Sequence, residues 1–260
     1  MHRILLTGWM GICAFVDIAV ADDAILDERL FPMPNAVVAI EPKVMATAAE
    51  IVPPCFARQV KGTKLEVFTT RGWGWVDRKQ VMTVAETEKY CTARKTEPYA
   101  LYLRSNLHLN NDKPDQALAD LNSAIKLDPT FAPALCARGN MYAANHDFGK
   151  ALADLTAAVK LAPHDLLAAN DIAWFRATCP DARFRDGKLA VADATRACAG
   201  AGYTNEEFLD TLAAAHAEAG DFKSAVKWAS KAAEIDPENE DFVKHVALFK
   251  AGKPLRDDGQ

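Results

Sequence analysis

Runs of lysine or arginine are absent from the sequence, and its formal net charge is −5 over 260 residues. Because phosphate binding needs a basic surface, this charge gives no reason to expect a nucleic-acid ligand. The sequence also lacks Gly-x-Ser-x-Gly, His-Glu-x-x-His and a phosphate-binding glycine loop with lysine. We therefore predict no catalytic residues, and we expect that the protein is not an enzyme.

Cysteine is scarce as well, with six residues and no Cys-x-x-Cys pair. The spacing of cysteine and histidine does not suit zinc, so we predict no metal site and no cofactor. Cys179 and Cys198 fall in one stretch of the chain, but Cys198 is expected about eleven residues along a helix, roughly 16 Å from Cys179. A disulfide needs Cα atoms within about 7 Å, so both thiols are expected to be reduced.

Only the first residues contain a long apolar run. Arg3 precedes the apolar stretch Ile4 to Val16, and Ala19-Val20-Ala21 has the small-x-small pattern of a cleavage site. This predicts a signal peptide over residues 1–21; a permanent anchor is the alternative, but the stretch would span only about 20 Å of the roughly 30 Å hydrocarbon core. We expect an exported protein, periplasmic or extracellular, that is not an integral membrane protein after cleavage.

An internal repeat is the strongest signal in the sequence. Ala117-Leu118-Ala119-Asp120-Leu121 returns as Ala151-Leu152-Ala153-Asp154-Leu155, at an offset of 34 residues. The register continues at Ala190, after an insertion of five residues around 178–183, and again at Ala225. Each unit reads as two helices joined by turn residues and closed by a proline step.

These residues resemble the tetratricopeptide repeat family. Its small residue midway through the first helix is matched by Ser105, Gly139, Ala173 and Ala213. Its small residues in the second helix are matched by Ala117, Ala151, Ala190 and Ala225, and by Ala124, Ala158, Ala197 and Ala232. Small side chains at these positions let two helices approach closely. The resemblance implies repeats over residues 98–239, and residues 240–260 read as an amphipathic capping helix followed by a mobile acidic tail.

Residues 22–84 differ in composition and are rich in valine, threonine and proline. Short runs predict strands at Ala36–Ile40, Lys43–Ala46, Ala57–Val60, Lys64–Thr70 and Gly74–Val76. The segment Arg71 to Asp77 resembles the end of bacterial Src-homology-3-like domains, which implies a small β domain. Trp73 and Trp75 would share one face of a strand, where they either cover the core or form an aromatic platform for peptide or glycan. Residues 85–97 read as a connecting helix.

The fold class predicted is mainly α: an α-solenoid of about four tetratricopeptide-like hairpins with a capping helix, preceded by a small all-β, barrel-like domain. His108 and His216 occupy the aromatic position of the repeat and are expected to be packed. The recurring Arg104 and Arg138, together with Asp120, Asp154 and Asp193, are expected to form scaffold ion pairs rather than a ligand site.

Members of the resembled family hold peptides on the inner face of their first helices. Carried over by register, the peptide-binding candidates are Tyr99, Tyr102, Asn106, Asn140, Asp171 and Asp210. The family's clamp for a carboxylate has lysine where this chain has Tyr102, and the two aspartates make the face acidic. The resemblance therefore implies a neutral or basic peptide, and each candidate has the alternative of a simple solvated helix position.

Three functional hypotheses follow. The leading one is an exported scaffold that binds a protein or peptide partner in the inner groove. The second is a cell-wall-associated binder that uses Trp73 and Trp75 on a cell-wall component. The third is an enzyme or enzyme regulator that uses the insertion near Cys179.

Overall fold

The computed structural model describes residues 31–257, apart from 33–36, 41–43, 48–56, 62–63, 70–71 and 78–79. The predicted signal peptide, residues 1–21, lies outside the described residues. The strands are β1 Phe31–Pro32, β2 Val37–Ile40, β3 Val44–Thr47, β4 Ala57–Lys61, β5 Lys64–Thr69, β6 Gly72–Asp77 and β7 Val81–Met82. Five of them form an antiparallel sheet in the order β3-β2-β6-β5-β4, and β1 pairs with β7.

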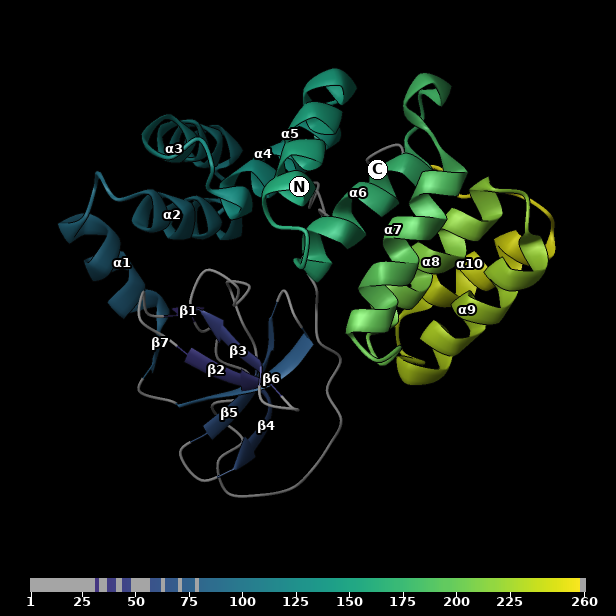
Figure 1. The fold of residues 1–260 in the computed structure, drawn as a ribbon, viewed down its shortest axis with the longest axis horizontal. Helices are drawn as coiled ribbons and strands as arrows, with labels where there is room; N and C mark the ends of the chain where they lie inside the picture. The colour runs from purple at the N-terminus through teal and green to yellow at the C-terminus, as the bar shows by residue number, and fades with distance from the viewer. Residues whose placement is uncertain are drawn as a thin grey trace, which may run out of the picture. The chain divides into compact units, whose positions relative to one another are not determined.

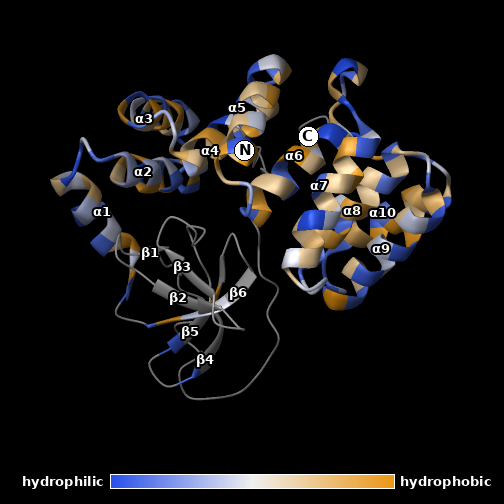
Figure 2. Cartoon of the chain, viewed as in Figure 1, coloured by the Kyte–Doolittle hydropathy of each residue, from blue (hydrophilic) through white to orange (hydrophobic). Residues whose placement is uncertain are grey.

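The remaining described elements are helical (Figure 1). They are α1 Val84–Ala93, α2 Pro98–Asn110, α3 Pro114–Leu127, α4 Ala132–Ala144, α5 Phe148–Leu161, α6 Leu166–Thr178, η4 Ala182–Phe184, α7 Gly187–Gly200, α8 Glu206–Glu218, α9 Phe222–Ile235 and α10 Glu240–Lys250. Within their own units α2 packs on α3, α6 on α7 and α8, α8 on α9, and α9 on α10. Orange and blue residues share these helices in Figure 2, as expected for amphipathic helices with one buried face.

The described residues form two compact units. The N-terminal unit contains the strands, α1 to α3, α4 as far as Arg138, and the link Lys160–Asp165. The C-terminal unit contains Gly139–Val159 and the residues from Leu166 onward. Among the described residues, no helix combines the length and the apolar character that a membrane crossing requires.

The predicted small residues lie at the closest helix contacts, and this confirms the helical hairpins. Ser105, Ala173 and Ala213 of the first helices are fully buried. The alanines of the second helices have no exposed surface: Ala117, Ala124, Ala151, Ala158, Ala190, Ala197, Ala225 and Ala232. A Cβ atom added to Gly139 of α4 would lie 2.9 Å from Cγ of Leu155 of α5, so the helices touch where the side chain is missing.

Three of the turns between paired helices share one backbone geometry. Asp112, His146 and Gly220 have positive φ values of 55°, 59° and 82°. In each turn, the next amide donates to a carbonyl five residues earlier, as in the 2.8 Å bond from Asp147 N to Tyr142 O. This left-handed closure ends the first helix of each hairpin.

The third hairpin replaces this turn with the predicted insertion. The insertion forms the short helix η4, and its Phe184 ring lies 5.9 Å from the ring of Phe148 and 6.3 Å from that of Phe175. The extra residues are therefore packed against α5 and α6, which belong to the same C-terminal unit.

Five of the seven described strands, β2 to β6, correspond to the predicted strands within two residues at each end, and the short strands β1 and β7 were not predicted. The connecting helix predicted over residues 85–97 is α1, which ends at Ala93. Closure of the sheet into a barrel stays a prediction, and no comparison with known proteins supports the Src-homology-3-like resemblance.

Candidate functional site

The predicted scaffold ion pair is confirmed in the first hairpin. Arg104 of α2 forms two hydrogen bonds with Asp120 of α3, at 2.5 and 2.7 Å, and Nε2 of His108 lies 3.4 Å from the same carboxylate. Arg138 donates to Asn122 at 2.8 Å, so this arginine reaches back to α3. In the third hairpin Arg176 binds Asp193 at 2.5 Å.

The described cysteines are buried and free. Burial raises the pKa of Cys91 to about 11 and that of Cys198 to about 12, and it also raises the pKa of Cys179. The thiolate is the reactive form of cysteine, so the raised pKa values favour the unreactive thiol form at neutral pH. No group of three metal-ligating side chains comes together within the part of the chain that the structure describes.

In the N-terminal unit, the predicted peptide-binding residues lie on α2. The Tyr102 ring is buried and meets the Phe131 ring edge-on at 5.6 Å, and Tyr99 joins the same cluster at 6.5 Å from Phe131. Asn106 donates from Nδ2 to the carbonyl of Tyr102 at 2.9 Å. The two tyrosines therefore pack with the link between α3 and α4, and the Asn106 amide bonds back to its own helix.

In the C-terminal unit, two of the predicted residues are brought together. Nδ2 of Asn140 donates to Oδ2 of Asp171 at 2.8 Å, across α4 and α6. Asp210 is only 4% exposed and lies 2.9 Å from Nδ1 of His245. Asp210 is thus engaged with the capping helix α10, which the sequence-based register did not indicate.

Sequence reasoning missed two further acceptors next to these residues, Asn170 and Glu207. The Oδ1 atoms of Asn140 and Asn170 are buried and have no hydrogen-bond partner among the described residues. Burial first, then the charges of Glu206, Asp171 and Asp210, raise the pKa of Glu207 to about 7. Glu207 has the same position in its hairpin as Tyr99, so the register could have found it.

We call these five residues of the C-terminal unit the acceptor face. They are Asn140, Asn170, Asp171, Glu207 and Asp210. Oδ1 of Asn140 and of Asn170 has no hydrogen-bond partner among the described residues. The three carboxyl groups are negative where they are ionised, and that of Asp210 is bonded to His245. The face can therefore accept hydrogen bonds and attract cations, but it offers no basic group of its own to an anion.

Sequence reasoning also missed Trp174 of α6 and Glu218 of α8. Trp174 follows Asn140 by 34 residues and has the same position in its hairpin, so the repeat register places it on the inner face. Glu218 is the last residue of its helix. Both side chains bind residues beyond α10.

Trp73 and Trp75, the second group of candidates, belong to the central strand β6. Trp75 pairs with Ala39 of β2 and with Glu66 of β5, and its side chain is partly exposed. Trp73 pairs with Phe68. That both side chains share one face of the strand, and what they do there, stays a prediction.

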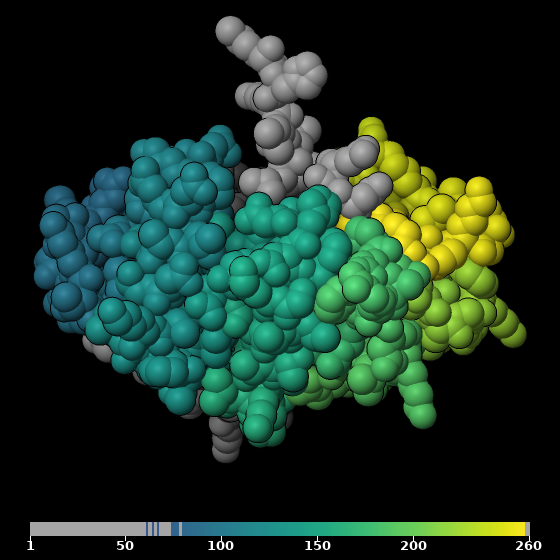
Figure 3. All heavy atoms as spheres, turned by 90° about the horizontal axis from the view of Figure 1, so that it is seen from above, coloured from purple at the N-terminus to yellow at the C-terminus, as the bar shows by residue number. Residues whose placement is uncertain are grey.

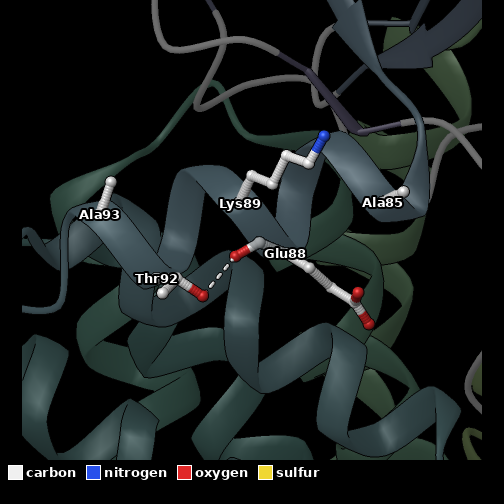
Figure 4. Close-up of a pocket in the computed structure, with 5 residues that line it drawn as sticks. All are labelled: Ala85, Glu88, Lys89, Thr92 and Ala93. Atoms are coloured by element: carbon white, nitrogen blue, oxygen red, sulfur yellow. Dashed lines mark hydrogen bonds between the residues drawn. The ribbon is translucent and has the colours of Figure 1, made fainter.

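A shallow pocket lies along α1 (Figure 4). It is lined by Ala85, Glu88, Lys89, Thr92 and Ala93. Thr92 donates to the carbonyl of Glu88 within the same helix, at 2.7 Å. The lining residues come from one exposed helix and converge on no common point, so the pocket offers no chemistry beyond that of a solvated surface.

The helical hairpins are similar to those of known proteins. Residues 98–131, which contain α2 and α3, match the model of the tetratricopeptide repeat. The solved structure of the type IV pilus biogenesis factor PilW is similar, with 20% identity, a TM-score of 0.53, and 59% of this chain and 69% of that chain covered. No curated protein matches this chain.

Two other tetratricopeptide repeat proteins share the fold. The thermophilic protein TTC0263 of Thermus thermophilus has 18% identity, a TM-score of 0.51, and coverage of 64% of this chain and 88% of that chain. YrrB, described as having an unusual peptide-binding site, has 19% identity, a TM-score of 0.50, and coverage of 64% and 82%. The helical region of this chain therefore has the fold of tetratricopeptide repeat proteins, and its first hairpin matches the family's repeat directly.

Proposed function

We propose that this protein is a non-enzymatic scaffold for protein–protein interaction, whose C-terminal unit binds a neutral or basic segment of a partner protein. The acceptor face is the observation that carries the proposal. Its five residues come from three first helices of successive hairpins, α4, α6 and α8. These helices present the inner face on which the family implies peptide binding.

The unsatisfied oxygens of the acceptor face favour a ligand that is rich in hydrogen-bond donors. A buried acceptor without a donor costs about 1–3 kcal/mol, and the Oδ1 atoms of Asn140 and Asn170 are two such acceptors. Backbone amides, lysine and arginine supply the missing donors. A peptide carboxylate supplies only more acceptors, so a C-terminal carboxylate is a poor ligand here.

The charge of the face supports the same ligand class. The raised pKa of Glu207, due to burial and to three neighbouring carboxylates, means that the folded protein holds negative charge there at a cost. A cation placed beside Glu207 offsets that repulsion and lowers its pKa again. We therefore expect binding of a basic segment to release a proton near pH 7 and to weaken as the salt concentration rises.

Photo-crosslinking in the native host tests the proposal. A photoreactive residue replaces Leu167, on the first turn of α6 and in the register of Tyr99, or Lys223, which is exposed on the outer helix α9. We expect a protein adduct from position 167 and none from position 223. Glu207→Gln should reduce the adduct, whereas the control Glu234→Gln on exposed α9 should leave it unchanged. Equal adducts from both positions, or no effect of Glu207→Gln, would contradict the proposal.

Export completes the proposed function, on the basis of residues 1–21. The expected mature chain begins at Asp22. Cell fractionation followed by N-terminal sequencing of the purified protein checks this expectation. Recovery of the chain from the cytoplasm with residues 1–21 intact would rule it out.

A further inference from the structure

The residues after α10 fold back against α6 and α8 of the same unit, although the sequence predicted a mobile tail. The amide of Asp257 donates to the carbonyl of Thr178 at 2.9 Å, and its Oδ2 accepts from Nε1 of Trp174 at 2.8 Å. Arg256 lies 2.7 Å from Oε2 of Glu218. In Figure 3 the yellow C-terminal residues border directly on the green segments that precede them.

These contacts use groups that a helix leaves unsatisfied at its end. Thr178 is the last residue of α6, and the carbonyls of a final helical turn have no partner within the helix. Arg256 also donates to the carbonyl of Ala177 at 3.4 Å, one residue earlier. The tail thus binds as an extended peptide would, through one backbone amide and two side chains.

The site exists without the tail, because its acidic group is held by a residue of the insertion. Nε of Arg185 donates to Oε1 of Glu218 at 2.9 Å, and its Nη1 donates to the carbonyls of Cys179 and Pro180 at 2.8 and 2.9 Å. When Arg256 leaves, Glu218 still has a charged partner and keeps its position. A preorganised site of this kind loses little affinity to reorganisation of the protein.

The tail is also weakly held. The Arg256 side chain is 32% exposed, and a partly exposed ion pair contributes roughly 0–1 kcal/mol. Polar contacts hold Arg256 and Asp257, and residues 253–257 form no helix or strand of their own. A competing segment with the same two side chains therefore meets a small barrier to exchange.

We infer that Trp174, Thr178 and Glu218 form a peptide site, which the chain's own tail occupies as an intramolecular ligand. A partner segment in which arginine precedes an acidic residue binds by displacing the tail. The arginine pairs with Glu218, the acidic side chain accepts from the Trp174 indole, and the amide between them reaches the carbonyl of Thr178. The statement about a partner rests on the proposed function, whereas the occupation of the site by the tail does not.

The test uses the tail itself as the probe. A labelled peptide with the sequence of residues 251–260 is titrated, with anisotropy as the readout, into the full chain and into a chain that ends at Gly252. We expect saturable one-to-one binding to the shortened chain. Binding to the full chain should be at least about tenfold weaker, because its own tail is present at an effective concentration in the millimolar range.

Variants identify the contacts. Replacing Arg256 by Ala in the peptide should weaken binding by up to about fivefold, as expected for a partly exposed ion pair. Replacing Asp257 by Ala, or Trp174→Phe in the shortened chain, removes the bond between indole and carboxylate and should weaken binding about tenfold or more. Trp228→Phe on α9 is the matched control and should leave binding unchanged. Equal binding of a scrambled peptide, or no binding by a shortened chain that unfolds normally, would overturn the inference.

A full-length variant covers the case in which shortening prevents folding. Arg256→Ala combined with Asp257→Ala keeps every residue of the chain but removes both side-chain contacts. It should bind the peptide more tightly than the unaltered chain, and the indole N–H resonance of Trp174 should shift. Unchanged binding and an unshifted resonance would mean that the tail is only a cap on α6. A failed crosslink at position 167 affects none of these outcomes, so the two proposals fail separately.

Discussion

Asp210 and His245 are 35 residues apart in the sequence and lie 2.9 Å apart in the structure, between Oδ2 and Nδ1. Asp210 belongs to α8 and is almost fully buried, and His245 belongs to the capping helix α10. The bond joins the last hairpin to the helix that covers it. An aspartate that the sequence placed on the binding face thus also anchors the cap.

This pair predicts a pH-dependent stability. Burial alone lowers the pKa of His245, but the hydrogen bond and the charge of Asp210 more than offset it, so the pKa lies above its ordinary value. The stabilisation is fully present below about pH 6.5 and is lost as the pH rises through the raised pKa. A hydrogen bond to a charged group contributes about 1.5–3 kcal/mol to stability. Urea unfolding should give a lower free energy of unfolding at pH 8.5 than at pH 6. His245→Asn should abolish this difference, whereas His164→Asn, at an exposed position, should leave it unchanged.

Glu207 predicts a second pH effect with the same sign and a lower range. Its pKa is raised from 4.5 to about 7, so the folded state favours the protonated carboxyl. Stability therefore falls as the pH rises from about 4.5 to 7 and is constant above that range. Glu207→Gln should raise the free energy of unfolding at pH 8 by on the order of 1–3 kcal/mol, while the exposed Glu234→Gln should change it little. An unchanged or lower value for Glu207→Gln would contradict the raised pKa of this carboxyl group.

The helical hairpins could be predicted because the fold repeats a local contact. Close helix packing requires a small residue at a fixed register, and the sequence shows that requirement directly through Ala117, Ala151 and their counterparts. The same register correctly indicated the bond between Arg104 and Asp120. Both contacts lie within one hairpin, where sequence spacing determines distance.

The tail and the insertion could not be predicted in the same way. Trp174 and Asp257 are 83 residues apart, and no periodicity relates them. The role of Arg185 depends on the path of an irregular loop, and its partner Glu218 is in the next hairpin. That the Oδ1 atoms of Asn140 and Asn170 lack a hydrogen-bond partner could not be predicted either, because it depends on side-chain geometry and not on the pattern of residue types.

Gly187, the first residue of α7, is predicted to be required for close packing against the end of α8. A Cβ atom on Gly187 would lie 2.6 Å from the backbone nitrogen of Ala219, and backbone cannot move aside as a flexible side chain can. Gly187→Ala should therefore destabilise the protein by about 1–3 kcal/mol. The control is Gly149→Ala on α5, where a Cβ atom meets nothing within 4 Å. That variant should be neutral or stabilising by up to about 1 kcal/mol in urea unfolding.

The shared turn geometry predicts opposite effects of glycine at two equivalent positions. Gly220 has a φ of 82° and His146 a φ of 59°, in the left-handed region that disfavours side chains. Gly220→Ala should cost about 1 kcal/mol, because a Cβ atom there meets the following carbonyl oxygen rather than a neighbouring residue. His146→Gly should stabilise by up to about 1 kcal/mol for the same reason. Chemical denaturation of both variants measures the two changes in the free energy of unfolding. The His146 ring meets the Phe148 ring edge-on at 5.6 Å, and His146→Gly removes this contact. If His146→Gly destabilises the protein by more than Gly220→Ala does, this ring contact outweighs the backbone strain.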